Sequence, residues 1–134
     1  MAVVAAVCFV WFGLVVGISF VEAPLKFRAP GVTTAIGLGI GRVVFRALNA
    51  IELVLGLVLL AAAFAATRLV GGIVAIDVVL LVQLIAIRPG LNRRSDRVLA
   101  GEDLPRSRLH FAYIALEIPK IIGLLAVGVL ALAG

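Results

Sequence analysis

The chain has 134 residues, of which 64% are hydrophobic and only 14% are charged, with a formal net charge of +5. A soluble domain is about half apolar and about a quarter charged, so this composition excludes an ordinary soluble domain and predicts a membrane protein. The apolar content also excludes a solvated basic surface, so we expect no nucleic-acid partner and interpret the basic residues as anchors at the cytoplasmic side. At this length we expect a single domain, residues 1–134.

The first apolar stretch, residues 2–21, contains no charged residue and is long enough to cross a bilayer, which takes about 20 residues. It has neither the basic start nor the cleavage pattern of a signal peptide, so we expect it to be retained as a span. Gly13 and Gly17 have the G-x-x-x-G spacing that lets two helices pack closely, either within the molecule or with another protein.

Residues 22–41 contain Pro24, Pro30 and the glycines at positions 37, 39 and 41, a density that breaks helices. We therefore predict a connection that lies on the membrane surface or dips into it. A short turn separates a second span at about 42–66 from a third at about 70–88, so these two should be antiparallel neighbours. The polar residues 89–108 form a second long connection, and the fourth span covers about 109–132. The predicted fold is an all-α membrane protein, a bundle of four antiparallel transmembrane helices.

The basic residues are distributed unevenly between the two sides of such a bundle. Ten belong to the two longer connections and the adjoining helix ends, against Arg68 alone on the other side. The ten are Lys26, Arg28, Arg42, Arg46, Arg88, Arg93, Arg94, Arg97, Arg106 and Arg108. Because basic residues favour the cytoplasmic side, we predict that both longer connections are cytoplasmic and that both termini lie outside.

Two predicted spans carry a polar stripe along one face. The stripe of the fourth span falls within an arc of roughly 80° at about 100° per residue and consists of His110, Tyr113, Glu117 and Lys120. The second span has Arg42, Arg46 and Asn49 on one face and Glu52 at its edge. Such stripes must face protein or water instead of lipid, so they predict a polar interior.

Four charged residues lie at similar depth near the middle of the last three spans: Glu52, Asp77, Glu117 and Lys120. Because a charge at the bilayer centre costs at least about 2.5 kcal/mol, we expect Lys120 to lie among the three acids. Asn49 and Tyr113 should line the same core. Gln83 points about 120° away from Asp77, so both cannot face the same neighbour. The core is either a closed cluster that fixes helix register or a path or pocket for a proton, cation or small amphiphile.

The inner ends of the second and fourth spans carry Arg42, Arg46 and His110, which we expect to contact lipid headgroups. The single histidine and the single cysteine, Cys8, provide no ligand set for a metal or haem, so we expect no cofactor and no metal site. The glycines before Arg42 match no nucleotide-binding fingerprint. No catalytic signature such as G-x-S-x-G or H-E-x-x-H is present, so we assign no catalytic residue.

Two regions of the sequence have a distinctive composition. The first region consists of residues 20–31 and 41–52, and the second of residues 109–120. The first region contains the motif Glu22-Ala23-Pro24-Leu25-Lys26-Phe27. Together the two regions resemble a group of small, uncharacterised four-span bacterial membrane proteins with an E-A-P-x-K-F motif. The resemblance covers most of the chain. It implies a four-span integral protein of a bacterial cytoplasmic membrane, and it implies no activity.

The sequence favours a non-enzymatic accessory or assembly component that binds lipids or other membrane subunits, or associates with itself. One alternative is a small oligomeric proton-coupled carrier that uses Glu52, Asp77, Glu117 and Lys120 as titrating groups. A weaker alternative is an enzyme acting on a lipid or quinone, with Glu117 and His110 as acid and base. In that case the two residues would have to converge, although they lie about 10 Å apart along the helix axis.

Overall fold

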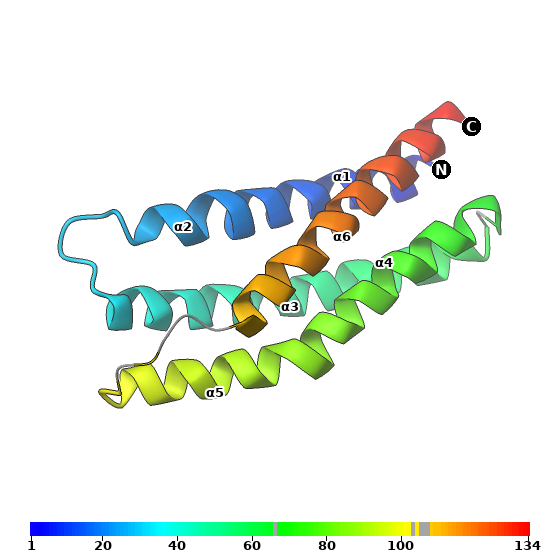
Figure 1. Ribbon diagram of the computed structural model, residues 1–134. Coiled ribbons are helices and arrows are strands. Elements are labelled where there is room, and N and C mark those ends of the chain that lie inside the picture. The colour runs from blue at the N-terminus through cyan, green and yellow to red at the C-terminus, as the bar shows by residue number, and fades with distance from the viewer. Residues whose placement is uncertain (66, 103, 105–107) are drawn as a thin grey trace.

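The computed structural model describes residues 1–65, 67–102, 104 and 108–134. This part of the chain contains four helices long and apolar enough to cross a membrane, at Ala2–Lys26, Thr34–Ala63, Thr67–Leu99 and Arg108–Ala133. We refer to them as spans 1 to 4. They run alternately up and down, with both chain termini at one end of the molecule (Figure 1). The predicted fold class, an all-α bundle of four antiparallel spanning helices, is confirmed.

Two of the spans are composite. Span 1 consists of α1 (Ala2–Val15), the π-helical segment η1 (Val16–Glu22) and α2 (Ala23–Lys26). Span 3 consists of the short 3-10 turn η2 (Thr67–Leu69), α4 (Val70–Val82), the π-helical segment η3 (Gln83–Ile87) and α5 (Arg88–Leu99). Spans 2 and 4 are the single helices α3 (Thr34–Ala63) and α6 (Arg108–Ala133). Single turns of π-helix occur frequently at functional sites.

The helices extend further into the predicted connections than the sequence suggested. Span 2 begins at Thr34 instead of residue 42, because the Thr33 hydroxyl caps it by accepting a hydrogen bond from the Ile36 amide at 3.1 Å. The glycines at 37 and 41 therefore do not break the helix. They leave room for the preceding segment, since a Cβ at Gly37 would collide with the Phe27 ring and one at Gly41 with the Lys26 amine.

Spans 1 and 3 are also longer than predicted. Each continues through a proline, Pro24 or Pro89, that lies in the first turn of a new helical segment, where proline causes no clash. Span 1 consequently ends at Lys26, and span 3 continues to Leu99 through most of what was predicted as the second connection.

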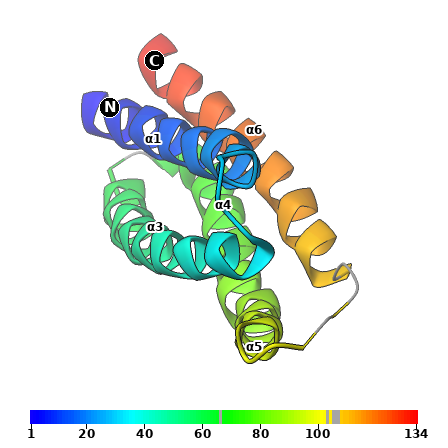
Figure 2. The ribbon, with the colours of Figure 1, turned by 90° about the vertical axis from the view of Figure 1, so that its left-hand side faces the viewer.

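Each span packs against two neighbours in the order 1, 2, 3, 4 around the bundle. The half of the bundle nearest the chain termini is filled by an apolar cluster that includes Cys8, Val15, Leu59, Ile73 and Leu124. Toward the other end α6 diverges from α2, as Figure 1 and the end-on view in Figure 2 both show. The opening between the spans at that end contains the larger cavity described below.

Glycine permits the closest approach between α1 and α6, but not through the predicted pair. A Cβ at Gly128 would lie 3.2 Å from the Cβ of Cys8 and 3.1 Å from the Phe9 ring. Gly13 and Gly17 are exposed, and a Cβ at either would meet nothing within 4 Å. Within this molecule the G-x-x-x-G pair therefore packs no helix, and its association with another helix stays a prediction.

Gly128→Ala should lower the free energy of unfolding by about 1–3 kcal/mol, because the added methyl group overpacks the contact of Gly128 with the Cys8 and Phe9 side chains. Gly13→Ala is the matched control and should raise it or leave it within about 1 kcal/mol, since alanine favours helix and the site is open. Reversible unfolding in mixed micelles, followed by circular dichroism, measures both variants. Equal destabilisation by the two substitutions would contradict the packing described.

Candidate functional site

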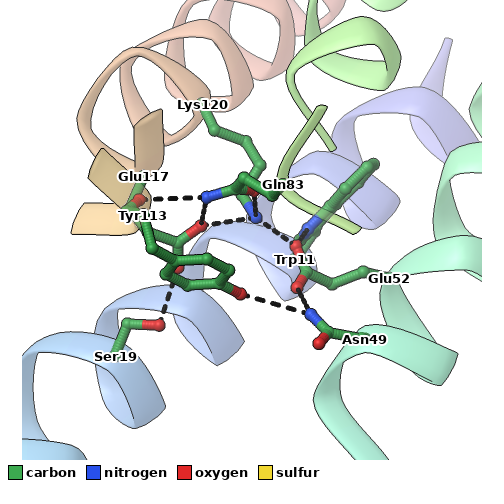
Figure 3. A network of polar contacts seen from close by, with 8 residues as sticks. All are labelled: Trp11, Ser19, Asn49, Glu52, Gln83, Tyr113, Glu117 and Lys120. Carbon is green, nitrogen blue, oxygen red and sulfur yellow. Dashed lines mark hydrogen bonds and ion pairs between the residues drawn. The ribbon is translucent and has the colours of Figure 1, made fainter. Parts of the chain in front are cut away.

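The centre of the bundle contains a buried ammonium group, that of Lys120 on α6. Its Nζ lies 2.5 Å from Oε2 of Glu52 and 2.6 Å from Oε1 of Glu117. It also donates to Oε1 of Gln83 at 2.9 Å. Figure 3 shows these four side chains close together. Each of them has an exposed fraction of 0%. A lysine ammonium has three N–H donors, and three acceptors surround it here.

The two carboxylates are satisfied by further donors from spans 1, 2 and 3. Glu52 accepts hydrogen bonds from the Trp11 indole at 2.8 Å and from the Asn49 amide at 3.2 Å. Glu117 accepts from the Ser19 hydroxyl and from the Gln83 amide, both at 2.7 Å. Each of the four carboxylate oxygens therefore has at least one partner, as burial of an ionised group requires.

The network also reaches Tyr113, the second residue of the polar stripe on α6. The Asn49 amide donates to the Tyr113 hydroxyl at 3.2 Å, and Gln83 donates to the Tyr113 carbonyl at 3.2 Å. We call these eight side chains the buried polar network; they are Trp11, Ser19, Asn49, Glu52, Gln83, Tyr113, Glu117 and Lys120 (Figure 3). With two carboxylates and one ammonium, the network has one formal negative charge in excess.

The structure brings five of the residues named from the sequence into contact: Asn49, Glu52, Tyr113, Glu117 and Lys120. Asp77 is not among them. Its carboxylate lies against Gly56, where a Cβ would be 2.7 Å from Oδ1, and this oxygen has no hydrogen-bond partner among the described residues. The two candidates on span 3 point in different directions, and Gln83 occupies the inward position instead.

The sequence interpretation missed Trp11 and Ser19, the contributions of span 1. They are eight residues apart and share a helix face with Val15, which is buried too. An indole N–H in an otherwise apolar span needs an acceptor, and this requirement was the available signal. Ser19 lies in η1 and Gln83 begins η3, so both π-helical segments supply a member of the network.

A cavity of about 700 Å³ lies at the end of the bundle opposite the chain termini. Five basic side chains line it, Lys26, Arg42, Arg88, Arg94 and His110, and no acidic residue is among the described lining. Five aromatic rings line it too, those of Phe20, Phe27, Phe45, Phe111 and Tyr113. Ser19 and Tyr113 belong to both the cavity wall and the network, so the network forms one boundary of the cavity. The enclosed Glu52, Gln83, Glu117 and Lys120 line neither this cavity nor the smaller one.

The Arg88 guanidinium lies between two of these aromatic rings. Its Cζ is 4.4 Å from the Tyr113 ring centroid and 4.8 Å from that of Phe45, and the rings meet edge to face at 87°. The Lys26 amine lies 5.9 Å from the Phe45 centroid on the neighbouring span and 3.7 Å from a Glu22 carboxylate oxygen. Cation–π contacts of this kind orient a cation without neutralising it.

The three predicted headgroup-contacting residues occupy different places. Arg42 lines the large cavity and forms an ion pair with Asp96 of α5. His110 also lines the large cavity. Arg46 is exposed and lines a separate cavity of about 280 Å³ together with Arg42 and Arg88. Within the described ranges, no group of three or more histidine, cysteine or acidic side chains is placed to bind a metal.

Replacing Lys120 with methionine should lower the free energy of unfolding by about 3–5 kcal/mol, because it leaves Glu52 and Glu117 buried without a counter-ion. The triple variant Lys120→Met/Glu52→Gln/Glu117→Gln should recover much of this loss, since no ionised carboxylate remains to be buried. Unfolding in mixed micelles measures both. A triple variant less stable than the single one would show that the two carboxylates stabilise the bundle independently of Lys120.

The two span 3 candidates should differ in the same assay. Gln83→Leu removes three hydrogen bonds from the network and should cost about 1–3 kcal/mol. Asp77→Asn should change the free energy of unfolding by less than about 1 kcal/mol, because Asp77 makes no bond within the network. If Asp77→Asn lowered the free energy of unfolding as much as Gln83→Leu, Asp77 would belong to the network and the placement described here would be wrong.

No protein-family model, curated protein or solved structure matches this chain. The resemblance to four-span bacterial proteins with the E-A-P-x-K-F motif therefore stays a prediction. In the structure that motif forms the end of span 1, where Lys26 faces the large cavity and Phe27 packs against Gly37.

Proposed function

We propose that this protein is a non-enzymatic component of a bacterial cytoplasmic membrane that binds a lipid-like amphiphile in the large cavity. The observation that carries the proposal is the cavity of about 700 Å³ with a lining that is both aromatic and basic. Ligand sites have volumes of roughly 300–1,000 Å³ and combine apolar walls with a few polar groups.

The position of the cavity supports an amphiphile over a water-soluble ligand. It lies at the end of the bundle where the basic residues are concentrated, and these residues favour the cytoplasmic side, with both termini outside. At this level of a bilayer, lipid headgroups meet the ends of the spanning helices. A lipid can therefore place its head among the basic side chains and its chain along rings such as Phe20 and Phe111.

The buried polar network suits a supporting role in this proposal. Its members on all four spans are enclosed and mutually satisfied, so the network fixes the relative positions of the helices that line the cavity. No observation gives comparable support to the proton-coupled carrier. The enzyme on a lipid or quinone would need Glu117, which is fully buried and has both oxygens bound within the network.

Lipid binding can be tested by filling the cavity. Ile114 lines it, whereas Ile118, one turn further along α6, is 48% exposed and is not part of the lining. Ile114→Trp should reduce bound phospholipid at least about tenfold, and Ile118→Trp should not, because only the first added indole occupies the cavity. Native mass spectrometry of the protein released from mild detergent, with a phosphatidylglycerol and phosphatidylethanolamine mixture, measures the bound lipid.

Thermal unfolding of both tryptophan variants establishes first that they are folded. The proposal is wrong if the wild-type protein retains no lipid, or if Ile114→Trp retains as much lipid as the wild type.

A further inference from the structure

We infer that the large cavity selects anionic amphiphiles over net-neutral ones, and that Arg88 and Lys26 form the site for the acid group. This inference rests on the proposed function and adds the chemical class of the ligand. The acid group is a phosphodiester or a carboxylate at the head of a hydrocarbon chain.

The surroundings of the Arg88 guanidinium favour the binding of an anion. Among the described residues it has no ion pair and no hydrogen-bond acceptor, and its Nε is buried without a partner. The rings of Phe45 and Tyr113 hold it in place at 4.8 and 4.4 Å. A guanidinium presents a planar set of donors that matches an acid group with two oxygens. Leaving such a cation half buried without an acceptor is costly, so a bound anion removes an existing penalty.

Lys26 supplies a second positive charge close to the first. Its Nζ lies 5.9 Å from the centroid of the Phe45 ring that also contacts Arg88, so one ring is shared by the two cations. Its side chain is 9% exposed. The Glu22 carboxylate lies 3.7 Å from the amine, beyond hydrogen-bond distance, and its Oε2 has no hydrogen-bond partner among the described residues.

The charges around the cavity favour an anion over a net-neutral headgroup. Arg94 and His110 line the cavity as well, and no acidic residue is among the described lining. Arg88 and Lys26 contribute two positive charges and Glu22 one negative charge, which leaves one positive charge over. Arg42 does not change this balance, because Asp96 pairs with it. The site formed by Arg88 and Lys26 is therefore positive overall, which favours an anionic ligand.

The apolar part of the wall accounts for the rest of the ligand. Phe20, Leu38, Leu91 and Ile114 line the same cavity and come from the four spans. A hydrocarbon chain can contact these side chains in the same cavity that Arg88 and Lys26 line. The bilayer offers such a molecule in the form of an anionic phospholipid, and a free fatty acid presents the same chemistry with a carboxylate.

The test compares three probes by native mass spectrometry: phosphatidylglycerol, phosphatidylcholine with the same acyl chains, and palmitate. The wild type should bind phosphatidylglycerol at least about tenfold more tightly than the net-neutral phosphatidylcholine, as expected for hydrogen bonds to a charged group. Arg88→Gln should reduce this ratio to about threefold or less. Arg93→Gln removes the same charge from the same helix at an exposed position outside the cavity lining, and it should leave the ratio unchanged.

Lys26→Gln should lower the ratio as well, and it provides the test if Arg88→Gln does not fold. Palmitate that binds more tightly than phosphatidylglycerol, and loses this affinity in Arg88→Gln, supports the site and assigns a carboxylate as the acid group. Equal affinity of the wild type for all three probes, or full preference retained in Arg88→Gln and Lys26→Gln, overturns the inference. Lipid binding that is lost in Ile114→Trp but shows no charge preference overturns only the inference and leaves the proposed function intact.

Discussion

The buried ammonium group of Lys120 is the interaction on which the rest of the bundle depends. A charge in this position cannot be left without acceptors in a membrane-spanning core, and it is surrounded by Glu52, Glu117 and Gln83. The two carboxylates in turn require donors, which come from Trp11, Ser19 and Asn49. One lysine therefore fixes the register of all four spans, because a shift of any helix would leave a buried polar group without its partner.

This constraint also shapes the cavity. Ser19 and Tyr113 belong to both the network and the cavity wall, so the closed, satisfied part of the core directly adjoins the open part. The balance of charge differs between the two sides of this boundary. On one side carboxylates and amine are in balance to within one charge, and on the other basic side chains gather without an acidic residue in the described lining. A rigid core beside a basic, aromatic recess is an arrangement that can hold the side chains of the proposed binding site in position.

Much of the fold followed from the sequence because hydropathy and length dominate in membranes. The four spans and their antiparallel order required only the counting of apolar residues. The helix ends were harder to predict. Pro24 and Pro89 occur at positions where the helix tolerates proline, and the glycines from 37 to 41 accommodate neighbouring side chains. Helix propensity alone predicts that these prolines and glycines break the helices. Only the tertiary structure shows that the helices continue through them.

The polar core was predictable where helical periodicity and depth agreed, as they do for Glu52, Glu117 and Lys120. Asp77 satisfied the depth criterion but faces Gly56, whereas Gln83, whose amide both donates and accepts, faces the network. The cavity had no signature in the sequence. It depends on α6 diverging from α2, and on Phe45 and Tyr113 holding Arg88 between them, which no single helix reveals.

An experimental structure in nanodiscs that contain phosphatidylglycerol tests the central claim most directly, because it observes the network and the cavity together. We expect lipid density in the large cavity with its acid group beside Arg88 and Lys26, while Lys120 stays within hydrogen-bond distance of Glu52 and Glu117 and no water reaches it. A cavity empty of lipid, or a water-filled channel that runs through Lys120, would contradict this claim.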